Sequence, residues 1–537
     1  MATPTGPALM ERLVSLCKRR GFIFQSSEIY GGINGFWDYG PLGVELKNNL
    51  RDVWWESMVR NPPPGPDGEE LQIVGLDCSI ISHPRVWEAS GHVGGFNDPM
   101  QTCRHCKKLF RADHVWEGLL ESEWVRALRT EFPGVTQDFL RPRLPDLIRW
   151  AESKGKKQAK GLALVRAQAA VKPRLEAELA RTPEPRLSDF LTWIGTEAGK
   201  PLQLPCPECG GDLTEPRQFN LMFETYVGAV RDDDTKAYLR PETAQGMFYN
   251  FKNVLDSTRV KIPFGICQVG RSFRNEVTPR NFIFRSREFE QMELEFFVHP
   301  SEATKWYQYW RDTRYTWWCN LGLAGRNLRL RDHEQDELAH YAKESGGCCD
   351  VEYAFPFSGE KGFTELEGIA YRSDYDLRQH AKVSGVSLDY FDQEKNERYL
   401  PHVIEPAAGL TRGLLAVLCE AYTVDESRPS PELMRFHPRL APTKCGVFPL
   451  VNKEGMPEIA EKIYADVRKQ VGPAQYDAKQ SIGKRYARMD EAGTPFCVTV
   501  DGQTVDEQTV TVRDRDTGNQ VRIGCDQVVE YLKERIG

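Results

Sequence analysis

The segment from Arg271 to Phe297 holds residue types that could bind a nucleotide. It predicts two strands joined by a charged loop. Because strand side chains alternate, Arg274 and Glu276 are expected on one face of the first strand. In the second strand, Phe289 and Glu293 share a polar face that alternates with apolar residues. An arginine suits a phosphate, a ring suits a base, and carboxylates suit an amine or a metal. The alternative is an exposed hairpin with surface ion pairs.

A second candidate site is the predicted strand-to-helix junction Glu405-Pro-Ala-Ala-Gly-Leu-Thr-Arg412. The backbone N–H groups that open a helix and the Arg412 side chain both favour an anionic ligand. A helix-opening arginine alone is usually a surface residue, but the Glu-Pro-x-x-Gly run before it favours a functional role. No Gly-x4-Gly-Lys-Ser/Thr occurs in the chain, so a P-loop is not the phosphate site.

Two Cys-x-x-Cys pairs have the spacing of zinc ligands: Cys103 with Cys106, and Cys206 with Cys209. They predict one structural zinc held by four thiolates; the alternative is four unmetallated thiols. The neighbouring pair Cys348-Cys349 is expected to be structural, because adjacent cysteines cannot easily share a disulfide and the sequence shows no metal partner nearby.

Several helices and strands must position these residues. Apolar spacing predicts helices over 8–24 and 43–59 and a strand over 71–81. From 218 to 420, strand-like and helix-like segments alternate without a repeat. The C-terminal segment, 443–537, reads as a small α/β domain.

Composition sets limits on the class of protein. The chain has 537 residues, 40% of them hydrophobic and 27% charged, which is typical of a soluble protein with two to four domains. No apolar run long enough to cross a membrane and no export signal occur. The fourteen cysteines, mostly scattered, fit a reducing cytoplasm. The net charge of −7 argues only weakly against a nucleic-acid partner, because binding depends on local basic patches.

Phe273 to Glu276 followed by Arg285 to Phe289 resembles motif 2 of the class II aminoacyl-tRNA synthetases. Residues 43–84 resemble motif 1, which builds the dimer interface in that class, and the junction at 405–418 resembles motif 3. The class I signatures are absent. Within class II, the chain is most similar to the dimeric, bacterial-like glycyl-tRNA synthetases. The strings that carry this likeness are Asp38-Tyr-Gly-Pro-Leu-Gly43, Ser90-Gly-His-Val-Gly-Gly-Phe96, Phe110-Arg-Ala-Asp-His114, Arg240-Pro-Glu-Thr-Ala-Gln-Gly246 and Glu365-Leu-Glu-Gly-Ile-Ala370.

The resemblance implies an α/β (α+β) fold in which an antiparallel catalytic sheet is flanked by helices. It also implies a C-terminal α/β anticodon-binding domain, in which Lys484, Arg485 and Arg513 are candidate tRNA contacts. The catalytic domain is expected to comprise two segments, 1–114 with motif 1 and the first cysteine pair, and 201–428 with the second pair and motifs 2 and 3. Between them lies a predicted helical insertion at 115–200, and after them a linker at 429–442 and the anticodon-binding domain at 443–537.

For ATP, the resemblance implies that Arg274 holds the α-phosphate and the substrate carboxylate, Phe289 stacks on adenine and Arg412 takes the γ-phosphate. Arg274, Glu276 and Arg412 are the expected catalytic residues. Glu365 is the candidate magnesium ligand. The full expected ATP site is Arg274, Asn275, Glu276, Phe284, Arg285, Ser286, Arg287, Glu288, Phe289, Glu365, Leu366, Gly409, Leu410, Thr411 and Arg412.

For glycine, the resemblance implies carboxylates around the α-ammonium in a pocket that excludes side chains. The expected residues are Arg111, Glu242, Phe289, Glu290, Gln291, Met292, Glu293, Glu405, Pro406, Ala407, Ala408 and Gly409. The family usually has serine where Ala407 stands, so one hydrogen bond to glycine is expected to be missing. No editing domain is expected, since every competing amino acid is larger than glycine.

The implied activity is that of a cytoplasmic, homodimeric glycine–tRNA ligase, which forms glycyl-adenylate from glycine and ATP and transfers glycine to the 3′ end of tRNA(Gly). Two alternatives stay open. One is a catalytically inactive, synthetase-like accessory protein of a DNA polymerase, against which the joint retention of Arg274, Glu276, Phe289 and Arg412 argues. The other is a class IIa synthetase for threonine, proline, serine or histidine.

Overall fold

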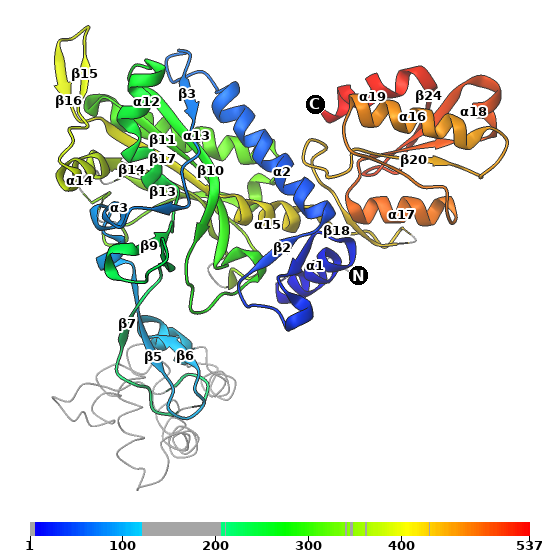
Figure 1. Cartoon of the computed structure of the whole chain (residues 1–537). Helices are drawn as coiled ribbons and strands as arrows, with labels where there is room; N and C mark the ends of the chain where they lie inside the picture. Colours follow the sequence, from blue (N-terminus) through cyan, green and yellow to red (C-terminus); the bar gives the residue numbers. More distant parts are fainter. Residues whose placement is uncertain are drawn as a thin grey trace, which may run out of the picture. The chain divides into compact units, whose positions relative to one another are not determined.

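The computed structural model of the chain describes residues 6–120, 206–209, 211–338, 341–343, 347–359, 362–428 and 430–537 (Figure 1). The chain divides into two compact units. One combines Met1–His92 with Met222–Gly537, and the other is Val93–Leu221. The predicted helical insertion at 115–200 lies outside the described residues, except for the short helix α5 (Val115–Leu120).

The larger unit is built on a seven-stranded sheet in which all neighbours are antiparallel except one parallel pair at an edge. The predicted antiparallel catalytic sheet is therefore confirmed. Its strands, in spatial order, are β12 (Leu328–Asp332), β13 (Cys348–Tyr353), β14 (Thr364–Ser373), β17 (His402–Gly409), β11 (Glu288–Val298), β10 (Phe264–Phe273) and β3 (Gln72–Gly75).

One face of this sheet carries the main hydrophobic core. In β11, Met292, Leu294 and Phe296 alternate toward this face and are fully buried, as the sequence pattern predicted. Helices α2 (Pro41–Trp55), α13 (Ala303–Asn320) and α15 (Leu410–Ala421) belong to the same core. The helix α2 overlaps the helix predicted over 43–59 and buries Leu46, Leu50 and Trp54, whose spacing places them on one side of it.

The side chains on the opposite face of the sheet change from apolar to polar along the strands. At one end Phe297 and Val403 form an apolar cluster with α11 (Ala244–Tyr249), α12 (Phe251–Thr258) and α14 (Tyr375–Ser384). Further along the same face, the side chains of β11 and β17 become acidic and then polar. The helices thus close one end of this face and leave a cavity over the other.

The N-terminal helix is shorter than the predicted segment 8–24. It runs over Pro7–Arg20 as α1, with Leu13, Leu16 and Cys17 buried. It ends early because Gly21 adopts a left-handed conformation (φ 75°), which lets its N–H bond back to the last turn.

The C-terminal region of the larger unit has its own sheet and core, as predicted. Its strands, in spatial order, are β21 (Ala474–Tyr476), β20 (Cys445–Pro449), β22 (Phe496–Val500), β23 (Thr509–Asp514) and β24 (Gln520–Gly524), packed with α16 (Met456–Gln470), α17 (Ile482–Ala492), α18 (Gly502–Glu507) and α19 (Val528–Ile536).

Two of the expected tRNA contacts in this region are engaged within the protein: burial contradicts the prediction for Arg485, and that for Arg513 stays a prediction. Arg485 is buried and donates to the carbonyls of Pro449, Leu450 and Asp477, so it ties loops together. Arg513 is held in a bidentate pair with Asp490. Both guanidinium groups are already occupied by the protein.

The smaller unit, Val93–Leu221, contains a three-stranded antiparallel sheet among its described residues. The order is β6 (Leu109–Arg111), β5 (Asn97–Thr102) and β7 (Arg217–Asn220). Cys103 follows β5 directly, and Leu213, near the second cysteine pair, forms an isolated bridge with it. The sheet therefore brings together two cysteine pairs that are far apart in sequence.

Candidate active site

A cavity of about 340 Å³ lies over the polar end of the seven-stranded sheet. Its floor comes from alternate residues of β11, β17, β14 and β13, because every second side chain of a strand faces the same way. Most of the sequence-predicted residues meet here. The lining comprises Glu242, Arg274, Glu276, Phe284, Arg285, Ser286, Phe289, Gln291, Glu293, His333, Tyr341, Cys348, Asp350, Glu365, Gly368, Ala370, Arg372, Glu405, Ala407, Gly409, Thr411 and Arg412.

The expectation that Arg274 and Glu276 share a strand face is wrong. The strand β10 ends at Phe273, and the chain turns at once, with the Glu276 N–H bonded to the Arg274 carbonyl at 2.6 Å. Both residues still line the cavity, but from the loop after the strand. The guanidinium of Arg274 lies 5.3 Å from the Phe289 ring centroid, and its Nε donates to the Pro241 carbonyl at 3.0 Å.

At the same end of the cavity, Arg412 opens α15 directly after β17. Its guanidinium lies over the Phe284 ring, 4.5 Å from the centroid, and pairs with the Glu365 carboxylate at 2.9 Å. The charge of Arg412, and then that of Arg274, lowers the pKa of Glu365 against the effect of burial. This end thus presents two arginines on aromatic rings beside an ionised carboxylate, a set suited to a nucleotide triphosphate.

The other end of the cavity is acidic. Glu405 accepts from Arg372, at 2.9 Å to each carboxylate oxygen, and Glu293 accepts from the Thr243 N–H at 3.1 Å. Burial, followed by the charges of Glu405 and Glu242, raises the pKa of Glu293 to about 8. Glu242 has a lowered pKa, because His92 and Arg372 outweigh the effect of its burial.

Small residues separate these carboxylates. Ala407 stands in register between Glu293 on β11 and Gly368 on β14, and Glu405 stands opposite Ala370. This part of the cavity therefore has a floor of small residues between carboxylates, which fits a small cationic group.

Other predicted residues have side chains that do not line the cavity. Leu366, Met292, Ala408 and Leu410 belong to the hydrophobic core. Glu290 pairs with Lys47, Glu288 with Arg271, and Arg287 donates to the Glu276 carbonyl. Asn275 and Pro406 are also absent from the lining. Arg111 belongs to the smaller unit, where it pairs with Asp98 at 2.9 Å.

Several residues that line the cavity were not predicted from the sequence. Arg372 follows Gly368 and Ala370 with strand alternation, so that periodicity was a usable signal. His333 and Asp350 gave no such signal. They lie with Cys348 so that one ligand atom of each falls within 4.8 Å of the others, and His333 Nε2 is 2.8 Å from Asp350 Oδ2. The expectation that Cys348 lacks metal-ligating neighbours is wrong.

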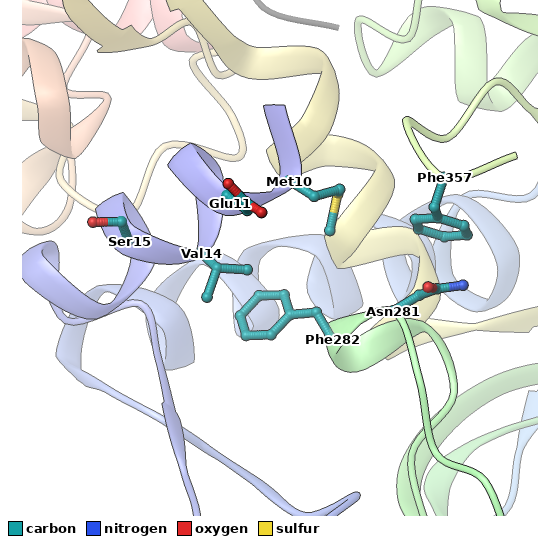
Figure 2. Close-up of a pocket in the computed structure, with 7 residues that line it drawn as sticks. All are labelled: Met10, Glu11, Val14, Ser15, Asn281, Phe282 and Phe357. Carbon is teal, nitrogen blue, oxygen red and sulfur yellow. The ribbon is translucent and has the colours of Figure 1, made fainter. Parts of the chain in front are cut away.

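A second hollow, of about 590 Å³, lies between α1 and the loop after β10 (Figure 2). Met10, Val14, Phe282 and Phe357 give it a mostly apolar lining, completed by Glu11, Ser15 and Asn281. Figure 2 shows the Phe282 ring reaching toward Val14. None of the predicted site residues lines it.

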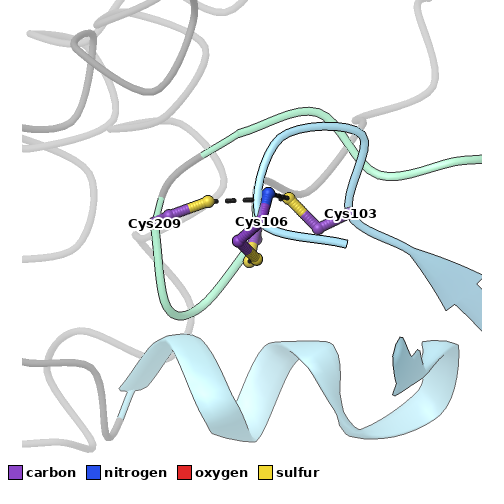
Figure 3. A group of neighbouring side chains, drawn as sticks. Cys103, Cys106 and Cys209 are labelled. Atoms are coloured by element: carbon purple, nitrogen blue, oxygen red, sulfur yellow. Dashed lines mark hydrogen bonds between the residues drawn. The ribbon is translucent and has the colours of Figure 1, made fainter. Parts of the chain in front are cut away.

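The four cysteines of the two Cys-x-x-Cys pairs, here called the knuckle cysteines, converge in the smaller unit as the spacing predicted. Figure 3 shows three of them, Cys103, Cys106 and Cys209. Cys103 Sγ lies 3.5 Å from Cys209 Sγ, Cys106 Sγ lies 3.7 Å from Cys206 Sγ, and all four sulfurs fall within 4.8 Å of one another. Zinc–sulfur bonds of about 2.3 Å in a tetrahedron place sulfurs at such separations. Although burial opposes it, backbone N–H groups lower the pKa of Cys103 to about 7, which favours a thiolate.

The comparisons with known proteins agree with this geometry. Residues 223–422 match the family described as tRNA synthetase class II core domain (G, H, P, S and T), and residues 444–535 match the anticodon binding domain. A glycine–tRNA ligase of Rhodopirellula baltica is 47% identical, over 98% of this chain and 99% of its own. Those of Thermobifida fusca and Caldanaerobacter subterraneus are 45% and 44% identical, each over 98% of both chains.

These relatives lend no support to the two alternatives, an inactive accessory protein or a synthetase for another amino acid. The cavity keeps the arginines and carboxylates that a decayed site would be expected to lose. At such identity over nearly the whole length, the chain belongs to the glycine–tRNA ligase family of class II aminoacyl-tRNA synthetases.

Proposed function

We propose that the cavity joins glycine to ATP and then passes the glycyl group to the 3′ end of tRNA(Gly). The observation that carries this proposal is that the two ends of the cavity differ in charge. One end has two arginines held on aromatic rings, and the other has carboxylates around a floor of small residues. A nucleotide and a side-chain-free amino acid would each meet complementary chemistry there.

In the first step, Arg274 holds the ATP α-phosphate next to the glycine carboxylate. A glycine carboxylate oxygen attacks the α-phosphorus, the bond to the β-phosphate oxygen breaks, and pyrophosphate leaves. Arg412 neutralises charge on the γ-phosphate, and Phe289 offers its ring to adenine. The protein acts by positioning and by charge stabilisation, so no side chain needs to become a nucleophile.

In the second step, a ribose hydroxyl of the tRNA 3′ adenosine attacks the glycyl carbonyl, and AMP leaves. The C-terminal domain is the proposed anticodon-binding module, with Lys484 and Arg513 as the remaining candidate contacts of the three predicted. The other predicted ATP and glycine residues that line the cavity belong to the same proposal, whereas those whose side chains do not line it, Arg111 among them, stay predictions.

Two properties of the cavity would select glycine: carboxylates that pair with its ammonium group, and a floor that limits the size of the side chain. Glu242, Glu293 and Glu405 are proposed to face its ammonium group, and Ala407, Gly368 and Ala370 to form the floor against which its Cα lies. A larger amino acid would collide with the floor, which is a strong form of discrimination. An editing reaction is therefore unnecessary.

Two metal ions fit the residues present. Glu365 is ionised, half-exposed and at the triphosphate end, and we assign it to magnesium, which screens phosphate charge when bound. The four knuckle thiols fit a structural zinc.

Reduced protein should contain about one zinc per chain, because four converging thiols close a tetrahedral site. Cys106→Ser should lower that content severalfold, whereas Cys349→Ser, at a buried thiol of β13, should leave it unchanged. Elemental analysis of freshly purified protein measures the ratio. Metal-free wild-type protein would contradict the assignment.

The homodimer predicted from motif 1 belongs to the proposal. Ile29 and Tyr30 are 89% and 86% exposed and Ile33 52%, an apolar patch that a second copy would cover. No described helix is long and apolar enough to cross a membrane. The predicted cytoplasmic location follows from the proposed role in translation.

Ala407→Ser should strengthen glycine binding. The Ala407 side chain faces the cavity between Glu293 and Gly368, and the oxygen of an added hydroxyl there would accept a hydrogen bond from the substrate ammonium. One such hydrogen bond contributes about 1 kcal/mol, so the KM for glycine should fall about fivefold. Ala408→Ser, which faces the core, should leave that KM unchanged. An unaltered KM in Ala407→Ser would refute the idea.

The function is tested by amino-acid-dependent ATP–pyrophosphate exchange with each of the twenty amino acids. Exchange with glycine alone supports the proposal. No exchange would favour the accessory protein, and exchange with another amino acid would favour a different specificity.

A further inference from the structure

The acidic end of the cavity holds more carboxylates than its neighbouring cations can neutralise. Glu293 and Glu295 of β11 and Glu405 of β17 project from the same face of the sheet, and each is at most 6% exposed. Both oxygens of Glu295 lack any hydrogen-bond partner among the described residues. A buried carboxylate without a partner is costly to ionise.

The basic side chains around this group already have partners. Arg372 makes a bidentate pair with Asp376, at 2.8 and 2.9 Å, and spends its remaining Nη on Glu405. Arg240 donates to two backbone carbonyls, those of Cys78 and Arg271. His92 faces Glu242 at 3.5 Å. The groups that bear on Glu293 or on its neighbour Glu295 are thus Glu242, Arg240, Thr243, Gln291, Arg372, Asp376 and Glu405.

We propose that glycine binding expels one proton from Glu293, so that the free pocket carries a proton where the bound pocket carries the substrate ammonium. This inference rests on the proposed function. The Glu293 O–H bond breaks, the proton passes to water at the open mouth of the cavity, and the ammonium keeps its three N–H bonds. The buried negative charge is neutralised before and after the exchange.

Hydrogen bonds identify Glu293 as the group that ionises. It accepts from the Thr243 N–H and hydroxyl and from Gln291 Nε2, the last at 2.5 Å, and such donors stabilise a carboxylate. Glu295 has no donor among the described residues, and burial and Glu405 raise its pKa well above the ordinary value. It therefore stays neutral in both states and separates Glu293 from the apolar end of the sheet face.

The sign of the pH dependence follows. Glu293, with a pKa near 8 in the free pocket, is protonated at neutral pH and must lose that proton before it can pair with an ammonium. Glycine affinity should rise about tenfold for each pH unit between about 6 and 8 and level off above, since one proton is released per binding event.

Calorimetry on the full chain tests the proposal. The probe is glycyl-sulfamoyl-adenosine, a stable mimic of glycyl-adenylate that carries the same ammonium. Titrations near pH 7 in buffers of different ionisation enthalpy should report about one proton released per chain. The propionyl analogue, in which a methyl group replaces the ammonium, should release about none. A release near zero with the glycyl compound overturns the proposal.

Two variants locate the proton. Glu293→Gln should abolish the release, and Glu295→Gln should keep it, since that side chain is neutral throughout. The reverse pattern would overturn the assignment. The proposed function fails separately: in that case neither glycine-dependent exchange nor binding of the mimic would occur at any pH. If glycine-dependent ATP–pyrophosphate exchange and tight binding of the mimic both occur without proton release, this inference is wrong and the proposed function still holds.

Discussion

Arg274→Lys should lower the rate of glycine-dependent ATP–pyrophosphate exchange by about 10²- to 10³-fold, the usual cost of removing one preorganised donor from developing charge. The Phe289 ring and the Pro241 carbonyl hold the Arg274 guanidinium at the cavity, where it would meet the reacting phosphate. A lysine keeps the charge but offers no planar, bidentate fork. Steady-state exchange assays at saturating glycine and ATP measure the effect.

Arg271→Lys is the matched control, since this arginine lies three residues earlier in the same hairpin. Its side chain is 56% exposed and pairs with Glu288, outside the cavity lining. Its exchange rate should stay within about twofold of the wild type, because surface pairs contribute little. Equal losses in both variants would show that the hairpin, and not the Arg274 fork, had been damaged.

Arg314→Met should destabilise the larger unit by about 3–5 kcal/mol, because it leaves a buried carboxylate without its cation. Arg314 and Glu367 are 0% and 1% exposed, and the guanidinium donates to both carboxylate oxygens, at 2.7 and 3.2 Å. This pair lies under β14, on the core side of the strand that carries Gly368 and Arg372 into the cavity. Urea unfolding followed by tryptophan fluorescence measures the change.

The double variant Arg314→Met with Glu367→Gln should recover most of that loss. The amide carries no charge, and its oxygen still accepts from Trp318 Nε1, which bonds to Glu367 at 2.6 Å in the wild type. Exposed Lys261, paired with Glu394, provides a surface control whose replacement by Met should change stability little. A double variant as unstable as the single one would show that lost packing dominates.

Local patterns predicted the site residues that lie close together in sequence. Alternation in β11 gave both its core residues and Glu293, and the junction before α15 gave Glu405 and Arg412. The same reasoning failed for Arg274, because nothing in the pattern showed that β10 ends one residue before it.

Features that depend on distant pairings could not be predicted. Arg372 reaches Glu405 only because β14 pairs with β17 in a particular register, and His333 meets Asp350 only through the pairing of β12 with β13. The buried roles of Arg485 and Arg513 depend on carbonyls and a carboxylate that the sequence does not place near them. The sequence shows which side chains are charged, but it does not show which group each of them pairs with in the fold.

The smaller unit leaves and rejoins the chain at a single stem. Strands β5 and β7 pair at Asn97 and Asn220, and the Asn220 side chain also bonds to the Val93 carbonyl at 3.2 Å. Since loop-closure cost grows only by about 0.6 kcal/mol per doubling of length, what lies beyond the stem can lengthen or shrink at little thermodynamic cost. Because the seven-stranded sheet takes no strand from the smaller unit, a change in the length of that unit's chain leaves the pairing of the catalytic strands as it is.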